Sequence, residues 1–599
     1  MTRSRNDFRW ALAVLVFSGA AALGHQLLWT RRMADLIGAT GDANTRVFGC
    51  FFLGVALGAA AAAMLMPRVS RPWRTVALIE LGIALLSLPA LLVNTWSALL
   101  WPAVGPEYLV SWRGAWLKSL LSVLIVLPPA FLVGMTLPVL TAAVWRARKG
   151  VAGDGVWLYG AYTLGGALGV AIVTGGALHW LGAAGSMLLM SGTNAVIGAV
   201  CFLRDRLLLL PVGGAVQESE PTPFAESLLP RQMLMLLSFA SGAGVLALEI
   251  AGLHLVNLKA PLAFYTPAAI LCCVVLLLAG SAGLAAAVIR LFHTPMPALI
   301  LACALAGLAA AVAPLLFLAA TAGGSGIGRH AACLAGSLLQ LGTVTCLSLG
   351  PAVLAAGMVF PLLISSIGWT PRATPARTFA RLLAINGVGG LLGAEIAHRL
   401  LLPSLGAHLA LGVLGAFYGL VSLALALKLQ PRHVLWLALP VGSVAATCLL
   451  LATSLKHAPI FLRGSTFRLV ELRSGREGTL AVAERPDLGR AMFVDNHYML
   501  GCSAGTPDMQ RQAHLPLLLH PQPRQVCFIG LGTGITAAAA RQHGAVESIE
   551  AVELCPLVAA ASARHFGQFN HNLASDPKAR VQVEDARTYI ASAPGRFDV

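Results

Sequence analysis

Long apolar stretches, broken by short segments that carry basic and turn residues, fill the chain up to about residue 455. About 20 apolar residues in a helix are enough to cross the roughly 30 Å hydrocarbon core of a bilayer. Thirteen stretches reach this length, near residues 10–30, 44–66, 75–97, 116–144, 156–178, 183–203, 233–256, 265–290, 296–320, 331–366, 379–402, 405–427 and 434–455. Residues 116–144 and 331–366 are longer and contain prolines, so we expect each to be kinked, tilted or partly re-entrant. The pattern predicts a polytopic α-helical membrane domain.

Short sequence blocks recur at a constant offset within this region. Ser18-Gly19-Ala20 returns as Ser241-Gly242-Ala243 and Gly134-Met135 as Gly357-Met358, each 223 residues later. Gly165-Gly166-x-x-Gly169 returns as Gly389-Gly390-x-x-Gly393 and Leu181-Gly182 as Leu405-Gly406, each 224 residues later. We predict two six-helix repeats in parallel orientation, because six crossings return the chain to its starting side. Such repeats build transporter-like bundles with a site between the halves, or a duplicated scaffold that binds nothing.

After Lys456 the apolar runs give way to alternating polar and apolar positions, with strands predicted at 465–473, 479–484 and 490–495 and then at 525–529, 548–552 and 579–583. The predicted organisation has six parts. It comprises a first six-helix repeat (1–209), a polar linker (210–232), a second six-helix repeat (233–430), an additional transmembrane helix (431–456), a small β-domain (457–523) and an α/β Rossmann-like nucleoside-binding domain (524–599).

Composition supports a membrane protein. Of 599 residues, 57% are hydrophobic and 11% are charged, whereas a soluble globular protein carries roughly 25% charged residues. The net charge of +16 is scattered between apolar runs, which argues against a nucleic-acid site and for membrane topology. With a cytoplasmic N-terminus, 18 basic residues fall on the inside and 7 on the outside. The eleven cysteines form no CxxC pair, so we expect no metal site and no disulfide framework.

Five ionisable residues fall within the predicted spans: His25, Glu80, Glu249, Glu395 and His398. A charge at the centre of a membrane helix costs roughly 2.5–3.5 kcal/mol on insertion scales, so these side chains should face the bundle interior. One hypothesis is a proton or cation pathway. The alternative is that the carboxyls stay protonated and hydrogen-bonded between helices.

A glycine-rich turn follows the strand predicted at 525–529. Glycines 530, 532 and 534 let a ligand approach the backbone at the start of the next helix, and Glu553 ends the next strand 21 residues after Gly532, where an acid can bind a ribose diol. Asp585 follows the third strand. We therefore predict cofactor binding by Gly530, Gly532, Thr533, Gly534, Glu553 and Asp585. The GxGxG spacing favours an S-adenosyl-methionine-type ligand over a dinucleotide, and the alternative is a doubly wound fold with an empty site.

Residues 513–521, with the sequence AHLPLLLHP, lead into this turn. Together with Val552-Glu553-Leu554 and Phe597-Asp598-Val599, they resemble the spermidine synthase (polyamine aminopropyltransferase) family. The resemblance covers about residues 465–599. The Ser18 and Gly165 blocks resemble the membrane half of fused, multi-pass spermidine synthase-like proteins. The resemblance implies that Glu553 binds the ribose and Asp585 the adenine of decarboxylated S-adenosyl-methionine. It also implies an amine or polyamine substrate, with His514 and Gln510 as candidate residues on the substrate side of the site. The resemblance is compatible with a homo-oligomer formed through the soluble domain.

Three departures from the family affect the amine end of the site. Thr533 stands where the family's glycine turn has an acid, Asp508-Met509-Gln510 replaces a Tyr-His-Glu stretch, and Met499 replaces a glutamine. The family's catalytic aspartate lies just beyond the fourth strand of the sheet. We therefore expect that this chain is truncated within that strand, that its catalytic base lies beyond Val599, and that it has no aminopropyltransferase turnover.

Three functions stay open at this point. The first is a membrane-anchored aminopropyltransferase that uses decarboxylated S-adenosyl-methionine. The second is a transporter or membrane scaffold with a nucleoside- or polyamine-sensing module, and the third is an S-adenosyl-methionine-dependent methyltransferase. We expect a cell (inner) membrane location with a cytoplasmic N-terminus. Thirteen spans put the soluble domain outside, but its cofactor is made in the cytoplasm, so we lean to a cytoplasmic domain.

Overall fold

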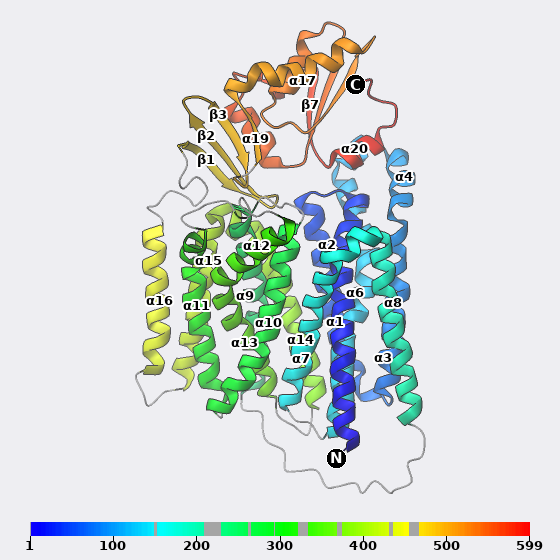
Figure 1. Cartoon of the computed structure of the whole chain (residues 1–599), viewed down its shortest axis with the longest axis vertical. Helices are drawn as coiled ribbons and strands as arrows, with labels where there is room; N and C mark the ends of the chain where they lie inside the picture. Colours follow the sequence, from blue (N-terminus) through cyan, green and yellow to red (C-terminus); the bar gives the residue numbers. More distant parts are fainter. Residues whose placement is uncertain are drawn as a thin grey trace.

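The structure is a computed structural model that describes residues 2–148, 152–208, 229–260, 265–292, 294–321, 327, 333–367, 374–429, 435–454, 466–496 and 498–599. A bundle of long helices carries a layer of strands and short helices at one end (Figure 1). Most of the predicted linker, residues 210–228, and the start of the predicted β-domain, residues 457–465, lie outside the described residues.

The first half of the bundle is formed by α1 (Thr2–Ile37), α2 (Gly41–Leu65), α3 (Pro72–Ser87), α4 (Val93–Val104), α5 (Pro106–Leu109), α6 (Trp112–Arg148), α7 (Ala152–Ile172) and α8 (Leu178–Leu208). The second half is formed by α9 (Arg231–Asn257), α10 (Tyr265–Phe292), α11 (Pro295–Ala320), α12 (Leu334–Ser348), α13 (Gly350–Ser365), α14 (Pro375–Ile396) and α15 (Leu402–Leu429), followed by α16 (Leu435–Ser454).

Nine helices in the described part of the chain are long and apolar enough to cross a membrane, or ten if α12 and α13 count as one bent span. Two of the nine, residues 153–207 and 375–428, contain 55 and 54 residues, about twice the length that one crossing needs. Each is interrupted at a glycine with non-helical dihedral angles, Gly182 and Gly406. The predicted count of thirteen spans depends on dividing the two helices at these glycines, on counting α12 and α13 as one span, and on counting α16, whose apolar part Trp436–Leu449 is shorter than the nine.

The two proline-containing segments behave differently. Helix α6 stays continuous through Pro128, Pro129 and Pro138, so the first segment is not re-entrant. The second segment breaks into α12 and α13, which meet at 64°. That break agrees with the expected interruption of residues 331–366.

The recurring glycines make the same kind of helix contact in both halves. Helix α1 packs on α7, and α9 packs on α14, at a distance that leaves no room for side chains. A Cβ atom added to any of these glycines would lie about 2 Å from a backbone oxygen of the facing helix: Gly19, Gly165, Gly169, Gly242, Gly389 and Gly393. Small residues permit such close packing where lipid supplies no hydrophobic driving force. The repeated Ser-Gly-Ala and Gly-Gly-x-x-Gly blocks therefore mark a repeated helix contact.

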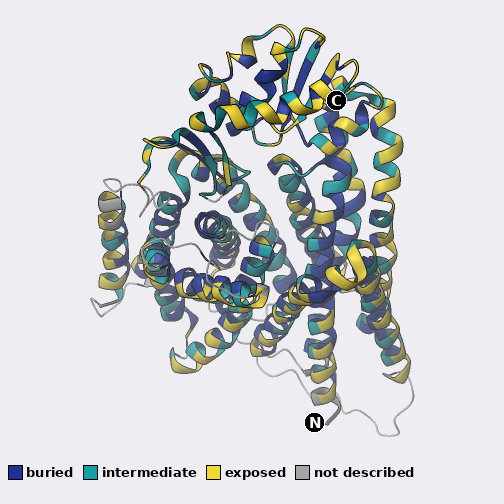
Figure 2. Ribbon diagram, turned by 45° about the horizontal axis from the view of Figure 1, so that its top comes forward, coloured by how far each residue is buried: buried dark blue, intermediate teal, exposed yellow. Residues whose placement is uncertain are grey.

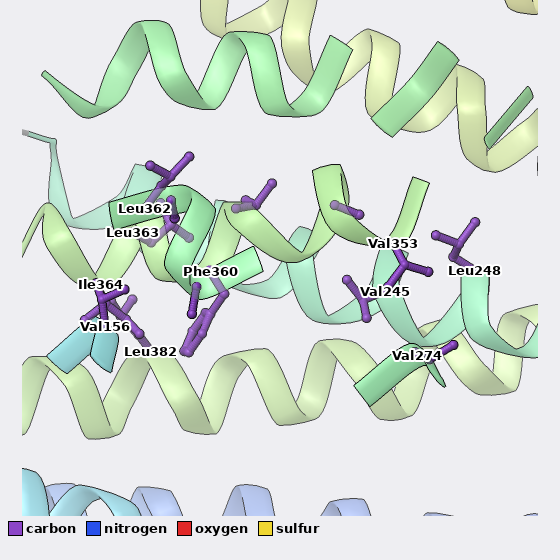
Figure 3. Close-up of a cluster of buried hydrophobic side chains, with 14 of the residues drawn as sticks. Val156, Val245, Leu248, Val274, Val353, Phe360, Leu362, Leu363, Ile364 and Leu382 are labelled. Carbon is purple, nitrogen blue, oxygen red and sulfur yellow. The ribbon is translucent and has the colours of Figure 1, made fainter. Parts of the chain in front are cut away.

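The interior of the bundle is apolar, and its outer surface is apolar as well. Figure 3 shows buried side chains that meet between helices of both halves, among them Val156 of α7 beside Ile364 of α13 and Leu382 of α14. Large apolar side chains also face outward, such as Trp180, which is 80% exposed, and Figure 2 shows exposed residues along the outer helices. A soluble protein rarely leaves such large apolar patches in water, so this surface suits lipid.

The N-terminus and the soluble layer lie at opposite ends of the bundle (Figure 1). The basic residues assigned to inside loops gather at the N-terminal end, since Arg71 is the N-cap of α3, Arg146 lies two residues before the end of α6 and Arg231 begins α9. If the bundle spans a membrane, the expected cytoplasmic N-terminus and the favoured cytoplasmic soluble domain cannot both be correct.

The soluble layer contains two sheets. Strands β1 (Arg468–Ser474), β2 (Thr479–Arg485), β3 (Gly489–Val494) and β4 (Tyr498–Cys502) form an antiparallel meander. Helix α17 (Thr506–Leu519) leads to a parallel sheet of β5 (Gln525–Ile529), β6 (Ser548–Glu553) and β7 (Ala579–Val583), with α18 (Ile535–Ala539), α19 (Pro556–His565) and α20 (Ala586–Ser592) between and after the strands. Six predicted strands are confirmed, and β4 was missed.

The last two residues of the chain extend the parallel sheet. The amide of Asp598 donates to the carbonyl of Gln525, and the amide of Cys527 donates to the carbonyl of Val599, both at 2.8 Å. These bonds place residues 598 and 599 along the edge of β5 that β6 does not occupy.

Candidate functional site

The carboxyl ends of β5, β6 and β7 meet at one edge of the parallel sheet. Ile529 is paired with Val552, and Glu553 is paired with Val583. The glycine loop, Glu553 and the Glu584-Asp585 turn follow directly after these paired residues. The predicted cofactor residues are therefore brought together, at the edge where parallel α/β sheets bind ligands.

The glycine loop requires its glycines. Gly530, Gly532 and Gly534 have φ values of +90°, +55° and +78°, a region that other residues rarely adopt. A Cβ atom on Gly530 would meet open space, whereas one on Gly532 would lie 3.0 Å from the carbonyl oxygen of Leu500 in β4. Strand β4 thus covers one side of the loop, and Gly530 leaves the backbone accessible.

Glu553 is held against this loop by backbone amides. Its Oε2 accepts hydrogen bonds from the amides of Leu531 (2.9 Å) and Gly532 (3.2 Å), and its Oε1 accepts one from Cys555 (3.0 Å). The side chain is buried. Since a carboxylate has about four acceptor positions, these three donors orient the group and leave capacity for a hydroxyl donor.

Asp585 is fully occupied by other donors. Its Oδ1 accepts from the amide of Arg587 (2.9 Å) and from Nε of the same residue (3.3 Å). Its Oδ2 accepts from Arg587 Nη2 and from the amide of Ala39, each at 2.8 Å. Burial acts to raise the pKa of Asp585, but the hydrogen bonds from Arg587 and Ala39 outweigh burial and lower the pKa. Ala39 belongs to the membrane half of the chain, a contact that the sequence did not predict.

The predicted substrate-side residues lie apart from one another. Thr533 is buried and its hydroxyl points at the sulfur of Met509 (3.5 Å), while Gln510 is half-buried on the same helix. His514 Nδ1 instead lies 2.9 Å from His543 Nε2. His543 follows the helical turns that begin at Ile535, so His514 lies at the end of those turns opposite to the glycine loop.

In the membrane half, Glu80 is the centre of a buried polar cluster. The carboxylate accepts hydrogen bonds from Ser18 Oγ of α1 (2.7 Å), Thr136 Oγ1 of α6 (3.3 Å) and Asn194 Nδ2 of α8 (2.6 Å). Asn194 Oδ1 lies 3.1 Å from His25 Nε2, so the amide links the imidazole to the carboxylate. Sequence reasoning named Glu80 and His25 but missed their three uncharged partners, which have no signal within an apolar stretch.

The other intramembrane candidates do not join this cluster. Glu395 pairs with Arg399 on its own helix at 2.5 Å. The rings of His398 and His254 meet edge to face at 5.8 Å, and Glu249 is half-buried on α9. Within the described ranges no group of three or more His, Cys, Asp or Glu side chains could hold a metal ion.

Comparison with known proteins identifies the C-terminal part of the chain. Residues 510–599 match the Spermine/spermidine synthase domain family. The polyamine aminopropyltransferase of Thermotoga neapolitana is 30% identical over 118 residues, which cover 20% of this chain and 40% of the relative. Polyamine aminopropyltransferase 1 of Aquifex aeolicus is 31% identical over 120 residues, covering 20% and 42%. The chain thus spans about two fifths of the length of the curated relatives that it matches.

Solved structures give two further similarities. The spermidine synthase of Thermotoga maritima is 26% identical, with 22% of this chain and 46% of that chain covered and a TM-score of 0.21. The E. coli fucose:proton symporter is 13% identical, with 70% and 98% covered and a TM-score of 0.40. The second match lies mostly outside the soluble part. The resemblance of the C-terminal region to the spermidine synthase family is confirmed by the domain match.

Proposed function

We propose, from the spermine/spermidine synthase domain at the C-terminus, that the soluble part of this chain binds an S-adenosyl nucleoside at the glycine loop. We further propose that it transfers an aminopropyl group to an amine. The observation that carries the proposal is Glu553, which the amides of Leu531 and Gly532 hold at the carboxyl end of β6. An acid at this place can accept hydrogen bonds from a ribose diol.

The residues fit the nucleoside better than they fit the transferred group. Glu553 has acceptor capacity left, and the backbone at Gly530 is open. Decarboxylated S-adenosyl-methionine supplies a carbon activated by a neighbouring sulfonium, which an amine nitrogen attacks. The protein's task is to bind and orient the two reactants and to accept the proton of the amine.

Two side chains at the amine end of the site, Thr533 and Met509, carry no negative charge. Thr533 contacts Met509 at the position where the family has an acid, and neither side chain can pair with an ammonium group. Transfer from S-adenosyl-methionine itself, as in a methyltransferase, therefore stays the alternative at the same nucleoside site.

Binding is tested with 5′-methylthioadenosine, which contains the nucleoside without the transferred group. Calorimetry on the whole chain in nanodiscs should show binding that falls roughly 100-fold in Glu553→Gln, because the altered side chain loses charge-assisted hydrogen bonds worth about 1.5–3 kcal/mol each. Glu547→Gln is the matched control, since Glu547 is exposed on the same domain. Equal affinities of the two variants would show that Glu553 does not bind the nucleoside.

Transfer is tested separately. The protein is incubated with decarboxylated S-adenosyl-methionine or with S-adenosyl-methionine and a set of amines, and mass spectrometry follows the thioether product. Formation of methylthioadenosine supports aminopropyl transfer, and formation of S-adenosylhomocysteine supports methyl transfer. Formation of either product would show that the expectation of no turnover is wrong, whereas binding without either product favours a nucleoside-sensing module over transfer by this chain.

A second function, transport of an ion or solute by the membrane half, is favoured by the Glu80 cluster. An ionisable side chain inside a membrane helix is rare and marks a functional site by default. The positions that correspond to Glu80, His25 and Thr136 in the second repeat are Cys303, Leu248 and Val359. The cluster therefore belongs to one half only, whereas the glycine contacts that build the scaffold occur in both.

A further inference from the structure

The nucleoside end of the soluble domain rests on the loop between α1 and α2. The amide of Ala39 donates to Asp585 Oδ2 at 2.8 Å. The preceding residue, Gly38, has a φ of +88°, and a Cβ atom there would lie 2.9 Å from Cβ of Asp585. Only glycine therefore allows the loop to approach Asp585 this closely.

Further contacts fix both sides of this junction. Lys118 Nζ of α6 lies 2.6 Å from Glu584 Oε2, and both side chains are buried. Glu584 Oε1 accepts the amide of Asp585 at 3.0 Å, so Lys118 orients the turn that carries Asp585. On the membrane side, Trp101 Nε1 donates to the carbonyl of Leu36 at 2.7 Å and holds the end of α1.

The hydrogen bonds of Asp585 leave no place for another donor. Each carboxylate oxygen already accepts two hydrogen bonds, and a carboxylate has about four acceptor positions in all. An adenine amino group that binds Asp585 must therefore displace a donor. The Ala39 amide is the donor that comes from outside the domain, whereas the Arg587 amide and side chain belong to the cap of α20.

We propose that the Ala39 amide occupies the position at Asp585 that the adenine amino group takes, so that docking of the α1–α2 loop and nucleoside binding exclude each other. This inference rests on the proposed nucleoside site. By linkage, whatever detaches the loop raises nucleoside affinity, and the bound nucleoside frees the loop by the same factor. Helix α1 also carries Ser18 and His25, so release of the loop acts on a helix that contributes to the Glu80 cluster.

The first test is hydrogen exchange of the whole chain in nanodiscs, with and without saturating 5′-methylthioadenosine. We expect amides in residues 38–40 to exchange at least fivefold faster with the nucleoside, the lower end of typical coupling between sites. Slower or unchanged exchange in this loop, with calorimetry showing that the nucleoside is bound, overturns the inference and leaves the proposed function intact. If calorimetry shows no binding, both fail.

The second test removes the competing donor. Ala39→Pro lacks the amide hydrogen, and Ala39→Ser keeps it and serves as the matched comparison for a changed side chain. We expect the proline variant to bind methylthioadenosine roughly fivefold or more tightly than the serine variant. Equal affinities, or weaker binding by the proline variant, overturn the inference. If the proline variant does not fold, the exchange measurement on the unaltered chain still decides.

Discussion

Replacing Lys118 by methionine should detach the soluble domain from the membrane half. Lys118 and Glu584 are 466 residues apart in the chain and form an ion pair at 2.6 Å, with side chains 5% and 7% exposed. Removing one partner of a buried pair costs roughly 3–5 kcal/mol, because the other charge stays buried and unpaired. We expect the free energy of opening this junction to fall by that amount in Lys118→Met.

Hydrogen exchange of α20 measures this opening. Tyr589 of α20 packs with Trp101, Leu109 and Val552 in a cluster shared by the two halves of the chain, so its amides become accessible when the halves separate. A loss of about 3–5 kcal/mol corresponds to exchange that is roughly 10²- to 4 × 10³-fold faster, provided that exchange occurs through this opening.

Two further variants make the test specific. Arg113→Met removes an exposed positive charge from the same helix and should leave exchange in α20 unchanged. The double variant Lys118→Met/Glu584→Met replaces the pair by apolar side chains and should recover most of the protection. If Lys118→Met exchanges no faster than Arg113→Met, the pair does not hold the junction and the reasoning is wrong.

Three other outcomes are expected. Glu80→Leu leaves three buried donors without an acceptor, whereas Glu80→Gln keeps an acceptor oxygen. We expect the leucine variant to be less stable than the glutamine variant by about 2–4 kcal/mol in thermal unfolding in detergent. Similar losses of stability in the two variants would contradict the hydrogen-bond network. Burial raises the pKa of Asp495 from 3.8 to about 6, so the folded state binds this proton more tightly and loses stability as pH rises through that interval. Asp495→Asn should therefore stabilise the β-domain by up to about 3 kcal/mol at pH 8 and should have no such effect at pH 4. Chemical denaturation followed by a signal from the β-domain measures the gain at each pH. An equal gain at both pH values would contradict the role of burial in raising the pKa of Asp495. Since Cys502 is buried, topology is better tested at Leu519→Cys, which is 84% exposed, in a chain without other cysteines. The basic N-terminal end predicts that an impermeant maleimide labels it in intact spheroplasts, and labelling only after permeabilisation would place the domain in the cytoplasm.

Local sequence patterns were sufficient for the parts of the fold that depend on local chemistry. The strands around the glycine loop were predicted within a residue or two, because buried parallel strands are short apolar runs between turn signals. The glycines at 530, 532 and 534 were identified because their spacing after a strand lets a ligand approach the backbone, and the structure adds that all three have positive φ values. Strand β4 was missed because Met499, Leu500, Gly501 and Cys502 show no alternation of polar and apolar residues.

The sequence by itself thus predicted a bundle of apolar helices that suits a membrane and a soluble part with a nucleoside-type glycine loop, and it named Glu553, Asp585 and Glu80 as chemically important. Only the tertiary structure decided what these carboxylates contact. The partners of Glu80 come from three helices up to 114 residues away, and the amide on Asp585 comes from 546 residues away. Hydrophobic periodicity specifies which face of an element is buried, but it carries no information about which distant element covers that face. For that physical reason the contact between the α1–α2 loop and Asp585 could be found only in three dimensions.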